Sequence, residues 1–273
     1  MKRLIATLLT FMVGAVISAG PALAEQMADI KKKGVLVVGV KTDYPPWGTR
    51  DAGGAIVGME PEMAADVAKR LGVKLELVPV VSSNRMQFLQ QGQIDLMIAT
   101  MSDTSERRKV VGIVDPVYYA SGVAILANKR AAIKNAGDLK GKPVCALQGA
   151  FYNNDLQSKY TGRDLVAFKG VPEAEQALLD GRCVGFVYDD VVLVWKKAQE
   201  AKWGDFEIVQ LNEWQPVPWG LAVRIEDLNG PWGKFMSDTV GDWLKSGALL
   251  DLEKKWVGGN TAWLSEATAK AKK

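Results

Sequence analysis

The chain has 273 residues, a formal net charge of +3 from 34 Lys and Arg against 31 Asp and Glu, and no histidine. A charge this close to zero excludes the basic field that binds nucleic acid or an anionic membrane surface. Without histidine the chain lacks the commonest general base and metal ligand, so serine–histidine and cysteine–histidine catalysis are excluded. We expect no metal and no cofactor, and a partner that is not a polyanion.

The first 24 residues have the pattern of a cleaved export signal. Lys2 and Arg3 precede an apolar run from Leu4 to Ala19, and the small-residue segment Ala22–Ala24 follows. The apolar run is short for a membrane span. We expect a signal peptide over residues 1–24, cleaved after Ala24, and a soluble mature chain; an uncleaved anchor is the alternative.

From residue 35 to residue 99, short apolar runs alternate with an amphipathic pattern. Met59, Met63 and Val67 recur at a spacing of four, and Gly72 is a helix stop signal. The alternation predicts a βαβαβ unit with a parallel sheet. Its expected strands are Val35–Val40, Leu75–Val80 and Ile94–Ala99, and its expected helices are Glu62–Leu71 and Arg85–Gln91.

A second unit of the same plan follows a connecting strand at 122–127. Its expected strands are Pro143–Leu147, Leu165–Phe168 and Cys183–Val187, with helices beginning near Asn153 and over Glu173–Leu179 and Val191–Ala201. Beyond it we expect a strand at Leu221–Arg224 and helices over Trp232–Trp256 that Gly247 interrupts. The sequence therefore predicts two lobes, with crossings near residues 118–121 and 214–218 and a discontinuous first lobe.

Hydroxyl groups and arginines follow the third strand of the first unit. Thr100 and Ser102 supply donors where the strand ends, and Arg107 supplies a planar fork that matches a carboxylate. The segment from Gly92 to Lys109 therefore predicts a carboxylate site. The alternative is an ordinary strand-to-helix turn with a solvated basic face.

The second unit repeats this pattern with an acid in place of the hydroxyl group. Asp189 stands eight residues after Gly181, just as Thr100 stands eight after Gly92. Ligands of open α/β sheets bind beyond the carboxyl ends of the strands. An anion site on one lobe facing a cation site on the other fits a zwitterion such as an amino acid.

The two cysteines, Cys145 and Cys183, fall in predicted strands of the second unit. In an exported protein an even pair predicts a disulfide. Two buried free thiols are the alternative.

The chain resembles the periplasmic solute-binding proteins of ABC transporters, in the branch that binds amino acids. The resemblance covers residues 34–257 and depends on the order and spacing of several short motifs. These motifs are Val38–Trp47, Gly92–Asp95, Thr104–Arg107, Asp115–Tyr119, Asp138–Lys142, Gly181–Asp189 and Lys254–Trp256.

The resemblance implies a type II periplasmic-binding-protein fold, in which two mainly parallel α/β lobes close over one ligand. It implies that Arg107 binds the α-carboxylate and Asp189 the α-ammonium. Further implied contacts come from Tyr44, Thr100, Met101, Ser102 and the loop Gln148, Gly149, Ala150 and Phe151. Relatives usually carry Gly-Thr-Thr in that loop, so Ala150 and Phe151 depart from the family.

The resemblance also bears on specificity. Glutamate and aspartate binders tend to carry a base where this chain has Lys41, and a Ser-x-Asn-Arg segment like the one from Ser82 to Arg85. Two cations and a hydroxyl group favour a ligand with a second carboxylate. Alternatively, Lys41 and Arg85 are solvated or paired with Asp43 and Glu76. Trp47 and Trp219 are possible cleft residues, and Asp190 is expected to cap the helix from Val191.

Three functions remain open after this reading. The first is a periplasmic, monomeric binding protein that closes on a small polar or acidic amino acid by a hinge motion and delivers it to a membrane permease. The second is an enzyme on the same fold, such as a dehydratase, and the third is the sensing partner of a membrane receptor. We favour the first, with lobe 1 over 25–119 and 217–257, lobe 2 over 120–216 and a C-terminal tail over 258–273.

Overall fold

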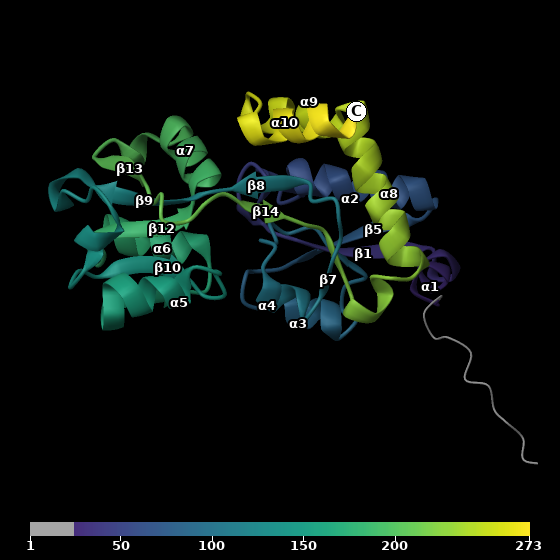
Figure 1. Ribbon diagram of the computed structural model, residues 1–273, viewed down its shortest axis with the longest axis horizontal. Helices are drawn as coiled ribbons and strands as arrows, with labels where there is room; N and C mark the ends of the chain where they lie inside the picture. The colour runs from purple at the N-terminus through teal and green to yellow at the C-terminus, as the bar shows by residue number, and fades with distance from the viewer. Residues whose placement is uncertain (1–24) are drawn as a thin grey trace, which may run out of the picture.

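A computed structural model describes residues 25–273, and the predicted signal peptide lies outside the described residues. Two five-stranded sheets, each with helices packed against it, form two lobes that lie side by side (Figure 1). The predicted two-lobed α/β fold is therefore confirmed. None of the helices from residue 25 onward is long and apolar enough to cross a membrane.

The first sheet has the strand order β5-β1-β6-β15-β7. Strand β1 pairs in parallel with β5 and β6, whereas β15 runs antiparallel between β6 and β7. The apolar run of β1 is buried because helices α2 and α3 pack against it. The bounds are β1 Val35–Val40, β5 Lys74–Pro79, β6 Leu96–Met97, β7 Gly112–Ile113, β15 Ala222–Val223, α1 Glu25–Lys33, α2 Met59–Leu71, α3 Arg85–Gln90 and α4 Ser105–Arg108.

The second sheet has the order β11-β10-β12-β9-β13. Strand β10 pairs in parallel with β11 and β12, and β9 is antiparallel to both β12 and β13. In each sheet one strand runs against the others, so both are mainly parallel as predicted. The bounds are β9 Val123–Asn128, β10 Val144–Leu147, β11 Leu165–Phe168, β12 Gly185–Asp189, β13 Phe206–Gln210, α5 Asn153–Leu156, α6 Val171–Leu179 and α7 Asp190–Gln199.

A disulfide joins Cys145 to Cys183, which confirms the predicted bridge and excludes the free-thiol alternative. Cys145 lies in β10, but Cys183 lies in the turn before β12 and not in the strand. The strand begins later than predicted because β10 and β12 first pair at Val144 and Gly185. The bridge thus ties the entry of β12 to the neighbouring strand.

Two antiparallel strands, β8 (Tyr119–Ser121) and β14 (Val217–Trp219), run between the lobes (Figure 1). The carboxylate of Asp190 accepts hydrogen bonds from the Gly122 amide at 2.9 Å and the Ser121 hydroxyl at 2.8 Å. The expectation that Asp190 caps the following helix is wrong, since Asp190 is the first residue of α7 itself. Its carboxylate instead forms hydrogen bonds that hold the end of β8 against helix α7 of the second lobe.

At the C-terminus, helices α8 (Pro231–Ser246) and α9 (Ala248–Val257) are separated at Gly247, whose φ of 83° ends the helix as predicted. Helix α10 (Ala262–Ala271) was not predicted, and it contacts α8, α9 and β8.

The small sheet β2 (Asp43–Tyr44), β3 (Gly48–Arg50) and β4 (Ile56–Val57) was also missed, because its strands are too short for an alternating pattern. Helix α1 was missed as well. Single turns of 3-10 or π helix lie at Lys129–Ala131, Ala136–Leu139, Gln157–Thr161, Gly162–Asp164, Ala201–Trp203 and Ile225–Asp227, and β14 was expected only as a crossing.

Candidate functional site

A small cavity lies between the two lobes, beyond the carboxyl ends of their parallel strands. Its lining is polar and comes from both lobes: Ser82, Arg85, Thr100, Ser102 and Arg107 on one side, and Ala150, Phe151, Tyr152, Tyr188 and Asp189 on the other. A wider hollow that includes Arg107, Ala150 and Phe151 adjoins it. The structure thus brings together eight of the residues that the sequence indicated.

Thr100 marks the point where the chain leaves the first sheet. Its φ of 47° lies in the left-handed region, which a threonine rarely adopts. The Thr100 amide donates to Glu60 Oε1 at 2.7 Å, and its carbonyl accepts from Arg85 Nη1 at 2.9 Å. Strand β6 ends at Met97 and does not continue to Ala99 as predicted, and the Thr100 backbone bonds side chains in place of a neighbouring strand.

Arg107 enters the cavity from the short helix α4, whose N-cap Thr104 accepts a hydrogen bond from the Arg107 amide. The Arg107 guanidinium donates to the Ser102 carbonyl at 3.0 Å and, across the lobes, to the Gly149 carbonyl at 2.9 Å. Burial and the nearby Arg85 lower the pKa of Arg107 to about 9, which leaves the guanidinium charged at neutral pH. Arg107 is therefore a buried cation and not part of a solvated basic face.

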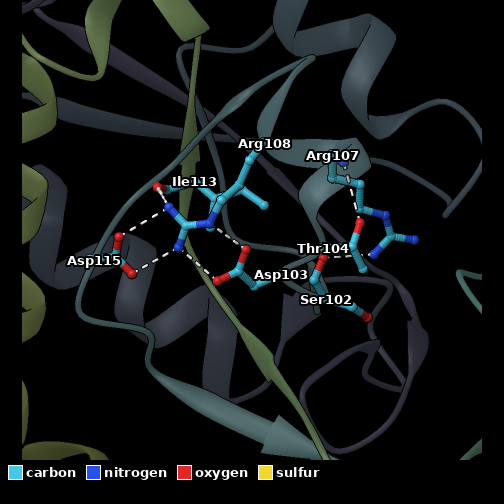
Figure 2. Close-up of polar contacts among 7 residues, drawn as sticks. All are labelled: Ser102, Asp103, Thr104, Arg107, Arg108, Ile113 and Asp115. Carbon is cyan, nitrogen blue, oxygen red and sulfur yellow. Dashed lines mark hydrogen bonds and ion pairs between the residues drawn. The ribbon is translucent and has the colours of Figure 1, made fainter. Parts of the chain in front are cut away.

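The neighbouring Arg108 points away from Arg107 (Figure 2). It pairs with Asp103 at 2.6 Å and with Asp115 at 2.8 Å, and hydrogen bonds to these carboxylates raise its pKa. The two adjacent arginines thus have different environments, and only Arg107 lines the cavity.

Asp189 is the last residue of β12 and is 8% exposed. Its Oδ2 accepts a hydrogen bond of 2.6 Å from the Tyr44 hydroxyl of the other lobe. Burial raises the pKa of Asp189, and the Tyr44 hydrogen bond and the charge of Lys41 oppose this rise. A buried carboxylate with one partner is suited to binding a cationic group.

Lys41 is buried beside this carboxylate but does not line the cavity. Its Nζ donates to the Tyr188 hydroxyl at 2.7 Å and lies 4.8 Å from the centre of the Tyr44 ring. Burial lowers the pKa of Lys41, and the charge of Asp43 opposes this effect most strongly. Lys41 therefore contacts the cavity only indirectly, through its hydrogen bond to Tyr188, which is a lining residue.

Arg85 is the first residue of α3 and is 3% exposed. Its Nη1 donates to the carbonyls of Ala99 and Thr100, and its Nε is buried with no hydrogen-bond partner among residues 25–273. The alternative that Lys41 and Arg85 pair with Asp43 and Glu76 is wrong for the part of the chain described, where neither forms such an ion pair. Asp43 instead accepts from the Val171 amide at 3.1 Å, at the start of α6 in the other lobe.

Some of the predicted contacts lie elsewhere. Met101 is buried in the core of the first lobe, and Gln148 is exposed, with its side-chain amide directed to the Ala167 carbonyl. Trp47 and Trp219 are buried and pack with Tyr44, with ring centroids 5.7 and 5.9 Å from its ring. Both tryptophans therefore pack behind Tyr44, and neither is among the residues that line the cavity.

Sequence reasoning missed Tyr152, Tyr188 and Glu60. Tyr188 has the pattern of an ordinary core residue in a strand, and Tyr152 follows the loop without a distinctive motif. Glu60 resembles the acidic first-turn residue that many surface helices carry. The one available signal was the position of Tyr188 directly before Asp189 at a strand end.

Two α/β lobes joined by crossing strands, with a charged cavity between them, define a two-lobed ligand-binding protein. The chain belongs to the bacterial extracellular solute-binding proteins, family 3, whose model matches residues 36–259. The family resemblance inferred from the sequence is thus confirmed.

The chain is 31% identical over 238 residues to the L-cystine-binding protein TcyJ of Escherichia coli strain K12, covering 85% of each protein. It is 28% identical to the glutamate/aspartate import solute-binding protein of Salmonella typhimurium, covering 86% of this chain and 80% of that one. A crystallised mutant of ArgBP from T. maritima has a TM-score of 0.78 at 31% identity, with 85% of this chain and 99% of that chain covered. The relatives from E. coli and S. typhimurium are both named as binding proteins.

Proposed function

We propose that this protein is the periplasmic amino-acid-binding component of an ABC transporter, and that its lobes close over the ligand by a hinge motion. The family match and the named relatives support an amino-acid binder of this kind. In such a system the closed, loaded protein delivers its ligand to a membrane permease, and a monomer suffices for that task. Ligand contacts made to both lobes favour the closed state over the open one.

One observation carries the proposal: a buried cation and a buried anion line the same cavity from opposite lobes. Arg107 would bind the α-carboxylate bidentately, exchanging its present carbonyl partners for the ligand. Asp189 would bind the α-ammonium. A zwitterion satisfies both groups, whereas a ligand with a single charge would leave one of them unpaired at high cost.

The ligand side chain is proposed to be acidic, as in glutamate or aspartate. Arg85 lines the cavity and has a buried Nε without a partner among the described residues, so a distal carboxylate would complete its hydrogen bonding. Lys41 adds positive charge behind Tyr188, and Ser82 adds a hydroxyl group. Relatives that bind other amino acids make the choice of ligand a question for experiment.

The test is calorimetry of unfolded and refolded, ligand-free protein against all twenty L-amino acids. We expect the tightest binding for L-glutamate or L-aspartate. If no amino acid at millimolar concentration gives a heat of binding, the proposed function is refuted.

Paired variants then separate the roles of the two cavity arginines. Arg107→Gln should weaken L-glutamate and L-glutamine alike, by about 2–5 kcal/mol, since both carry the α-carboxylate. Arg85→Gln should weaken L-glutamate more than L-glutamine, by about 1–3 kcal/mol. Arg108→Gln is the matched control, because its partners Asp103 and Asp115 lie outside the cavity. Equal losses for both ligands in Arg85→Gln would refute the acidic preference.

A further inference from the structure

A buried carboxylate, Glu60, lies behind the ligand cavity without lining it. It is the second residue of α2 and is fully buried. Its Oε1 accepts hydrogen bonds from the Thr100 amide and the Tyr118 hydroxyl, and its Oε2 is buried with no partner in the described structure. A half-satisfied buried carboxylate is costly, so its presence calls for a role.

Glu60 holds one side of Thr100, and Arg85 holds the other. A threonine stays in the left-handed region only when its surroundings fix it there. Here the Thr100 amide binds Glu60 at 2.7 Å, while its carbonyl and hydroxyl accept from Arg85 at 2.9 and 3.5 Å. A cavity residue is thus clamped between a carboxyl group and a guanidinium group of opposite formal charge.

Four groups face Glu60 from the elements around it. They are the Thr100 amide after β6, the Tyr118 hydroxyl before β8, the Lys41 ammonium after β1 and the Arg85 guanidinium at the start of α3. All four lower the pKa of Glu60, but burial outweighs them and raises it to about 7. Because the chain has no histidine, no imidazole competes with this carboxyl as the group that titrates near neutral pH.

We propose that Glu60 is a positioning and specificity-determining residue whose protonation lets the cavity accept an amino acid with a second negative charge. The inference rests on the proposed function and deepens it. When Glu60 is ionised, its charge neutralises part of the positive field of Arg85 and Lys41 and repels the distal carboxylate of the ligand. When Glu60 is protonated, its carbonyl oxygen still accepts from Thr100, and the field of the two cations is left for the ligand.

Binding of an acidic amino acid should therefore be accompanied by uptake of a proton at Glu60. The Kd of L-glutamate should rise by about tenfold from about pH 6 to about pH 8, below the tenfold per pH unit that one linked proton allows at most. The Kd of L-glutamine should change much less, because that ligand carries no second charge.

The experiment is calorimetry with L-glutamate and L-glutamine from pH 6 to pH 8, in buffers of different ionisation enthalpy that report proton uptake. Wild type, Glu60→Gln and Glu253→Gln are compared. Glu253 is the matched control, since this buried carboxylate also binds a tyrosine hydroxyl (Tyr119, 2.6 Å) and a backbone amide (Thr261, 3.0 Å), away from the cavity lining. We expect Glu60→Gln to abolish the pH dependence and proton uptake for L-glutamate, and Glu253→Gln to keep both.

A pH dependence that is the same for both ligands in wild type would overturn the inference, as would one that persists in Glu60→Gln. The wild-type comparison decides the question even if Glu60→Gln does not fold. Binding of both ligands with flat profiles would remove the role of Glu60 and leave the proposed function intact. Absence of binding by either ligand, with none from the other amino acids, would overturn the proposed function and this inference with it.

Discussion

Gly149 lies at a contact between the two lobes, and replacing it with alanine should obstruct closure. Gly149 follows β10 of the second lobe and has a φ of 80°. A Cβ atom added there would lie 2.7 Å from the Ser82 carbonyl oxygen and 3.0 Å from Ser83 Cα, both in the first lobe. Backbone atoms cannot rotate away from such a contact, so the lobes would have to move apart.

The size of the effect follows from this geometry. Relief of the contact requires a shift of several tenths of an ångström, which would also lengthen the 2.9 Å bond from Arg107 to the Gly149 carbonyl. Overpacking of this kind costs about 1–3 kcal/mol, which corresponds to a rise in Kd of roughly 5- to 150-fold. The left-handed backbone adds about 1–2 kcal/mol of strain, but this strain is present with or without ligand and so affects stability and not Kd.

The assay compares Gly149→Ala with Gly181→Ala, by calorimetry with L-glutamate and by urea unfolding without ligand. Gly181 lies in the same lobe with a φ of 73°, and an added Cβ there would meet nothing within 4 Å. Both variants should lose similar stability, and only Gly149→Ala should lose affinity. Wild-type affinity in Gly149→Ala would show that the ligand-bound lobes do not meet in this arrangement.

Replacing both Cys145 and Cys183 with serine should lower the free energy of unfolding by about 4 kcal/mol, because the bridge spans 38 residues; a loss below about 1 kcal/mol in urea unfolding would contradict the loop-entropy argument. The folded pKa of Glu60, about 7, lies above its ordinary value of 4.5, so the folded state binds the proton more tightly. As the pH rises from 4.5 through 7, the free energy of unfolding of the wild type should therefore fall by about 3 kcal/mol relative to that of Glu60→Gln. Parallel curves of unfolding free energy against pH for the two proteins would disprove this prediction. Asp189→Asn should weaken every amino-acid ligand by about 2–5 kcal/mol in calorimetry, and an unchanged Kd would remove Asp189 from the ammonium site.

Patterns that repeat over short distances predicted most of the fold. A buried strand was predicted from the apolar run Val35–Val40, and its crossover helix from the four-residue spacing of Met59, Met63 and Val67. Both patterns lie within short segments of the sequence. The same holds for the stop at Gly247. The short sheet formed by β2, β3 and β4 escaped prediction, because two or three residues do not establish a period.

The sequence by itself also indicated Arg107 and Asp189, since both stand at strand or helix ends where α/β lobes place ligands. It did not determine the partners of the charged residues. Lys41 meets Tyr188 across 147 positions, and Glu60 meets Thr100 across 40. The first pairing depends on how one lobe closes against the other, and the second depends on packing within the first lobe. No local pattern carries that information. Tertiary packing alone therefore decided that Lys41 stands behind the cavity, that Gln148 faces away from it, and that a first-turn glutamate became its buried acid.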